Sequence, residues 1–169
     1  MVRIPAFRDG FWEGKEFMTR REAAMANFKK GYNCSQSVVL AFEDMLPVEK
    51  RDLSKMASSF GGGMGRLREV CGAVSGMFIV AGFLYGYDGP EDGNAKAGHY
   101  ARIQELAHSF EERQGSIVCR ELLGLDVRHD APQPEKRTAE YYKKRPCEEL
   151  VGEAAGILEE YIRNNPVSD

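Results

Sequence analysis

Apolar residues recur along most of the chain at the three- and four-residue spacing of amphipathic helices, and no stretch shows the period-two alternation of a surface strand. Two helix starts carry capping-box pairs, Thr19 with Glu22 and Asn33 with Gln36. The spacing predicts helices at residues 20–30, 34–46, 48–60, 94–114, 117–123 and 147–165, with a weaker one at 138–143. The pattern therefore predicts an all-α fold.

The longest apolar segment follows a glycine-rich loop and predicts a helix over about residues 68–85 that is buried on most sides. Gly72 and Gly76 lie one turn apart on it, which would let another helix approach closely. We expect a single-domain multi-helix bundle around this central helix, formed by residues 19–169. An aromatic-rich arm, residues 1–18, precedes it and, with the Gly72/Gly76 face, would suit a homodimer.

Length and composition fit one globular domain, since the chain has 169 residues and is 43% hydrophobic. The net charge of -3, with both signs interspersed, does not favour a nucleic-acid partner. The N-terminus lacks the pattern of a secretory signal, and the apolar run from Val70 to Tyr85 is shorter than a membrane span of about 20 residues. We therefore expect a cytoplasmic protein with no membrane role.

Candidate chemistry lies in four cysteines, each predicted in the opening turn of a helix: Cys34, Cys71, Cys119 and Cys147. Unpaired N–H groups and the helix dipole stabilise a thiolate there, and thiolates attack disulfides and bind soft metals. Structural disulfides are not expected, because the cytosol keeps thiols reduced. Basic residues near three of the cysteines would favour the thiolate further: Arg66, Arg68, Arg120, Lys143, Lys144 and Arg145.

These cysteines support three hypotheses. The first is a thiol-based redox protein that cycles between dithiol and disulfide, with Cys34 and Cys71 foremost and Cys119 and Cys147 as resolving or relay thiols. The second is a metal or iron–sulfur protein in which all four are ligands, because four thiolates meet the ligand count of zinc or of a cluster. The third is a non-catalytic helical module in which the cysteines only pack. Four cysteines allow three full pairings, and the sequence does not choose among them.

The loop before the central helix is a candidate cofactor-binding element, formed by Gly61, Gly62, Gly63, Gly65 and Arg66. Glycine-rich backbone can cradle an anion with its N–H groups. The order of a phosphate loop is missing and no strand precedes it, so nucleotide binding is not favoured. The favoured interpretation is a sharp turn that lets another segment, such as one bearing a cysteine, approach the central helix.

The histidines do not predict a metal site. His99 and His108 are nine positions apart and so lie on opposite faces of one helix. His99 shares a face with Ile103 and is expected in the core, whereas His129 lies in a polar connection and is expected in solvent.

The ordered motifs resemble a bacterial and archaeal family of redox-active proteins named for its cysteines, the C_GCAxxG_C_C family. The matching motifs, between Thr19 and Ile162, are Gly31–Gln36, Phe60–Arg66, Cys71–Gly76, Cys119–Gly124 and Cys147. The chain departs from the name at one point, since the family pattern has glycine before this cysteine and alanine directly after it, where this chain has Val70 and Gly72. The resemblance implies a redox role with an unknown redox partner or small-molecule substrate.

Overall fold

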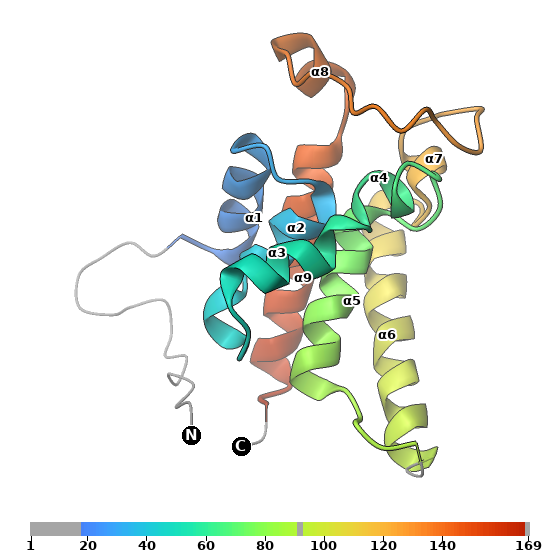
Figure 1. The fold of residues 1–169 in the computed structure, drawn as a ribbon. Coiled ribbons are helices and arrows are strands. Elements are labelled where there is room, and N and C mark those ends of the chain that lie inside the picture. Colours follow the sequence, from blue (N-terminus) through green and yellow to red (C-terminus); the bar gives the residue numbers. More distant parts are fainter. Residues whose placement is uncertain (1–17, 91–92, 168–169) are drawn as a thin grey trace.

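The computed structural model describes residues 18–90 and 93–167, and this part of the chain is an all-α bundle without strands, which confirms the predicted fold class (Figure 1). The helices are α1 Arg20–Lys29, α2 Cys34–Leu40, the 3-10 turn η1 Glu43–Met45, α3 Lys50–Ser58, α4 Gly61–Met64, α5 Gly72–Tyr85, α6 Gly93–Gln114, α7 Cys119–Leu122, α8 Ala139–Lys144 and α9 Cys147–Asn164. The predicted arm, residues 1–18, lies outside the described residues except for Met18.

Both predicted capping boxes are confirmed, and the second one fixes the start of α2. The Asn33 side chain accepts a hydrogen bond from the Gln36 amide at 2.9 Å, and the Gln36 side chain accepts one from the Asn33 amide at 3.0 Å. Cys34 is therefore the first residue of α2. The predicted end at residue 46 is wrong, because α2 ends at Leu40 and the chain continues into η1.

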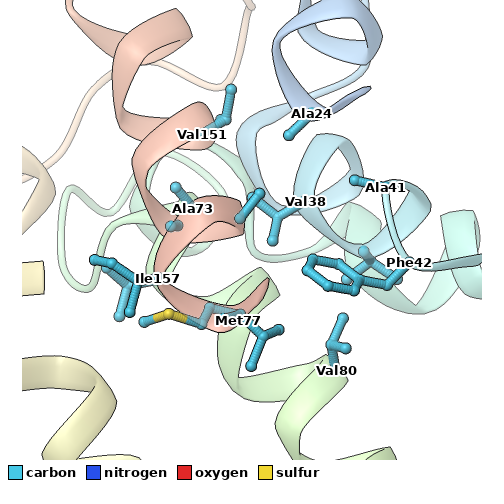
Figure 2. Packing of buried hydrophobic residues seen from close by; sticks show 14 of the residues in the cluster. Ala24, Val38, Ala41, Phe42, Ala73, Met77, Val80, Val151 and Ile157 are labelled. Carbon is cyan, nitrogen blue, oxygen red and sulfur yellow. The ribbon is translucent and has the colours of Figure 1, made fainter. Parts of the chain in front are cut away.

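The core forms around α5, which contacts α2, α6 and α9. Figure 2 shows Ala73 and Met77 of α5 among side chains of α2 and α9, and both are fully buried. The predicted close approach to α5 is made by α2: a Cβ atom on Gly76 would lie 2.8 Å from the Ser35 carbonyl oxygen. Because α2 of the same chain covers this glycine face, the face is not free for a second copy.

The central helix begins later than predicted, at Gly72 instead of residue 68. The preceding segment pairs with the chain before α7: the Cys71 amide donates to the Ile117 carbonyl at 2.8 Å, and the Cys119 amide to the Glu69 carbonyl at 2.6 Å. Arg68 has a positive φ of 59°, which is incompatible with a helix. Cys71 is consequently the residue before α5 and not a member of its first turn.

Helix α6 covers α5 with Leu106 and Phe110, which are both buried. Tyr100 lies in the first turns of α6, which are largely solvent-exposed, and 52% of its surface is exposed. His99 is only half-buried and contacts the Tyr87 ring edge-on, and His129 is exposed as predicted. Within residues 18–90 and 93–167, no helix combines the length and apolar character needed to cross a membrane.

Candidate thiol site

All four cysteines line one cavity of about 200 Å³. Cys34, Cys119 and Cys147 are the first residues of α2, α7 and α9, which confirms their predicted place in an opening turn, whereas Cys71 directly precedes α5 and lies just outside its first turn. In Figure 1 the starts of α5 and α9 lie at the end of the bundle that carries α4 and α7. All four are free thiols, and Cys71, Cys119 and Cys147 are buried.

Glycines allow the cysteine-bearing segments to meet. A Cβ atom on Gly63 would lie 2.5 Å from the Cβ of Cys119, and one on Gly72 would lie 3.0 Å from the Cβ of Cys34. Gly63 also has a φ of 68°, a conformation that other residues rarely adopt. The glycine-rich loop is thus a tight turn that places a cysteine-bearing segment beside it, as favoured from the sequence. Gly61, Gly62, Gly63 and Arg66 border the cavity, whereas Gly65 is not among its lining residues.

Among the four thiols, Cys34 and Cys147 interact most strongly, through a hydrogen bond between their side chains. This contact lowers the pKa of Cys147 and raises the pKa of Cys34 well above its usual range. Burial opposes ionisation of Cys147, while Arg145, Arg68 and Arg137 favour it. The pair therefore loses its first proton at a lower pH, and its second proton at a higher pH, than two separate thiols would.

The other two sulfurs favour the protonated form. Burial raises the pKa of Cys71 to about 12, although the backbone amides of Ala73 and Val74 oppose this. Burial also raises the pKa of Cys119, and the guanidinium of Arg68 opposes it from 3.7 Å. The first sulfur to ionise in this cavity is consequently that of Cys147.

Arg68 and Arg66 enter the cavity wall from a strained turn, with φ values of 59° and 71°. Arg68 is buried and forms an ion pair with Asp130 at 2.5 Å. Arg66 donates to the Ala131 carbonyl at 2.6 Å and lies 3.4 Å from Asp130. The turn therefore supplies two positive charges next to the sulfurs.

The polar connection between α7 and α8 completes the wall. Glu135 of this segment binds Arg145, and Arg137 donates to the carbonyls of Phe28 at 2.5 Å and Tyr32 at 2.7 Å. Sequence reasoning missed Arg137, Glu135 and Asp130 as site residues. Their only signal was charge within a proline-marked segment, and such segments are usually solvated loops.

Not every basic residue that flanks a cysteine in sequence reaches the cavity. Arg120 binds Glu69 at 3.0 Å, and Lys144 binds Glu140 at 2.5 Å, while Lys143 is exposed. None of the three belongs to the cavity wall. Among the described residues, no group of three or more His, Cys, Asp or Glu side chains is arranged to hold a metal ion.

Comparison with known protein families places the chain in one of them. The family model described as "Putative redox-active protein (C_GCAxxG_C_C)" matches residues 32–161, a span that contains all four cysteines. The chain belongs to this family. No curated protein and no solved structure matches it. Membership in the C_GCAxxG_C_C family brings only the redox description that the family model carries, and the reaction has to be inferred from the thiol site.

Proposed function

We propose that the protein is a thiol–disulfide redox protein whose reactive dithiol is Cys34 and Cys147. The proposal is carried by the hydrogen bond between these two side chains, which shifts their pKa values in opposite directions. Thiol–disulfide exchange needs one sulfur that is readily ionised and a second sulfur within reach to resolve the mixed disulfide. Cys147 and Cys34 meet these two requirements.

In this proposal the Cys147 thiolate attacks the disulfide of an oxidant and forms a mixed disulfide. The departing thiolate takes the proton of Cys34, whose sulfur then attacks Cys147 and releases the second thiolate. The products are one intramolecular disulfide and two reduced sulfurs, so two electrons pass from the protein to the oxidant. Cys71 and Cys119, protonated by burial, serve as relay thiols after this disulfide has formed.

The decisive experiment maps disulfides after equilibration with 2-mercaptoethanol and its disulfide at graded ratios. Acid quenching, alkylation and peptide mass spectrometry should find a Cys34–Cys147 disulfide as the first oxidised species. Cys147→Ser should abolish it, and Cys34→Ser should leave a mixed disulfide with 2-mercaptoethanol on Cys147. The proposal is wrong if Cys34 and Cys147 remain thiols across the series or if each pairs with a different cysteine first.

The metal alternative is favoured by one observation, that all four cysteines line the same cavity. Two measurements distinguish the metal alternative from the dithiol proposal. They are metal analysis and a visible absorption spectrum, both on protein prepared without oxygen and without affinity metals. Stoichiometric zinc or iron that is lost on each single Cys→Ser change would make the cysteines a ligand set and displace the dithiol proposal. Metal-free, colourless and folded protein would leave dithiol exchange in place.

We place the protein in the cytoplasm in this proposal, since a reducing compartment keeps a dithiol ready to react. Cys147 is 8% exposed, so its sulfur lies below the protein surface. This burial favours a small-molecule substrate over a partner protein, because the disulfide of a folded partner would have to enter the cavity.

A further inference from the structure

The size of the cavity limits what can reach Cys147. Its volume of about 200 Å³ is below the roughly 300 Å³ at which sites for drug-sized ligands begin. Pro134 and Glu135 line it and are exposed, so the cavity opens to solvent beside the connection between α7 and α8. The substrate is therefore a small molecule that enters past this segment.

The charge of the wall selects among small molecules. The charged residues that line the cavity are four arginines and one carboxylate: Arg66, Arg68, Arg137, Arg145 and Glu135. Asp130 pairs with Arg68 and Arg66 from outside the wall. With both carboxylates counted, two positive charges remain in excess at a partly desolvated site, and one remains in excess once Cys147 is a thiolate. Such an excess concentrates anions and repels cations.

Two of the four arginines are better placed than the others to contact a ligand. Arg137 uses both terminal nitrogens on backbone carbonyls, and Arg68 is held between Asp130 and Cys119. Arg145 instead binds Glu135, whose side chain is 45% exposed. The terminal nitrogen of Arg66 lies 4.0 Å from Glu135 and 3.4 Å from Asp130, while its Nε donates to the Ala131 carbonyl. A ligand carboxylate can take the place of such an exposed carboxylate, since the guanidinium fork binds either one in the same geometry.

We propose that the small-molecule oxidant of the Cys34–Cys147 dithiol is an anionic disulfide, which Arg66 and Arg145 bind by its acidic group; this rests on the dithiol chemistry proposed above. The reaction is balanced without a further reactant. The Cys147 thiolate and the Cys34 thiol become one disulfide, the disulfide bond of the ligand breaks, and the ligand leaves as one thiol and one thiolate.

Three small symmetrical disulfides of opposite or no charge test the proposal: dithiodiacetate, bis(2-hydroxyethyl) disulfide and cystamine. For each compound, the rate of Cys34–Cys147 disulfide formation is divided by the rate at which the same compound reacts with free 2-mercaptoethanol. This normalisation removes differences in the intrinsic reactivity of the three compounds. We expect the normalised rate to be about tenfold or more higher for the dianion than for the neutral compound at low salt, and lowest for the dication. The preference should shrink at high salt.

Substitutions test whether Arg66 and Arg145 cause the preference for the dianionic disulfide. Arg66→Gln and, separately, Arg145→Gln should lower the dianion-to-neutral ratio by about threefold to tenfold. The ratio is the appropriate readout because any change in the Cys147 thiolate affects both rates equally. Arg51→Gln is the matched control, since Arg51 lies outside the cavity wall with 79% of its side chain exposed, and it should leave the ratio unchanged.

The outcomes separate the two proposals. Equal normalised rates for the three compounds, or a ratio that neither arginine substitution changes, would refute the anion preference and leave the dithiol intact. Failure of all three compounds to oxidise Cys34 and Cys147 would refute the dithiol proposal itself.

Discussion

Replacing Gly76 by alanine tests whether the contact between α2 and α5 sets the position of Cys34. The added Cβ atom would lie 2.8 Å from the Ser35 carbonyl oxygen and 3.0 Å from the Cβ of Val38. Carbon atoms in contact prefer a separation of about 3.5 to 4.0 Å, so the two helices must move apart by several tenths of an ångström. The start of α2, with Cys34 as its first residue, has to shift with them.

The expected cost follows from two opposing terms. Overpacking a close-packed core costs about 1 to 3 kcal/mol, whereas alanine in place of glycine in a helix interior returns about 0.5 to 1 kcal/mol. We therefore expect Gly76→Ala to lower the free energy of unfolding by about 1 to 2 kcal/mol. Gly82→Ala, in the same helix, is the control because nothing lies within 4 Å of its added Cβ. It should stabilise the protein by about 0.5 to 1 kcal/mol.

Urea unfolding of the reduced proteins measures both free energies, and alkylation of Cys147 reports on the site. The two variants should differ by about 2 kcal/mol, which corresponds to about 4 to 8 °C in melting temperature for a chain of this size. Gly76→Ala should also slow alkylation of Cys147 at neutral pH, because its contact with Cys34 is disturbed. Equal stability of the two variants would refute the argument that α2 and α5 are in contact at Gly76.

Three further predictions concern the thiols and the glycine turn. Cys34→Ala should raise the pKa of Cys147, read from the pH dependence of its alkylation, because the sulfur loses a hydrogen-bond donor; an unchanged pKa would contradict the pairing. Burial raises the pKa of Cys71 from 9.0 to about 12, so the unfolded chain releases this proton first and the thiol's contribution to stability is lost as pH rises from 9 towards 12. Urea unfolding across this pH range should show that the free energy of unfolding falls less steeply with pH in Cys71→Ala than in the unmodified protein, by up to about 1.4 kcal/mol per pH unit. The same dependence on pH in both proteins would count against the burial of this thiol. Gly63→Ala should cost about 2 to 4 kcal/mol in urea unfolding, through its positive φ and the collision with Cys119, whereas Gly115→Ala, which has a positive φ but no neighbour within 4 Å, should cost only about 1 kcal/mol; equal costs would show that the Cys119 contact is unimportant.

The sequence by itself determined the fold class and the ends of most helices. Side-chain spacing is a local property, and capping residues act on the turn that follows them, so Asn33 and Gln36 fix the start of α2 without help from the rest of the chain. The same reasoning placed Cys34, Cys119 and Cys147 at helix starts. Local signals were insufficient at Arg68, where pairing with the chain before α7 replaces the predicted first turn of the central helix.

Tertiary structure alone decided how the cysteines group and in which direction the pKa of each thiol shifts. Cys34 and Cys147 are 113 positions apart by their numbers, and no local pattern distinguishes this pair from the other pairings that four cysteines allow. The charges that act on Cys147 include Arg137, which approaches from the polar connection between α7 and α8. A thiol pKa depends on burial and on charges within a few ångströms, and these distances are set by the packing of helices that are remote in the chain.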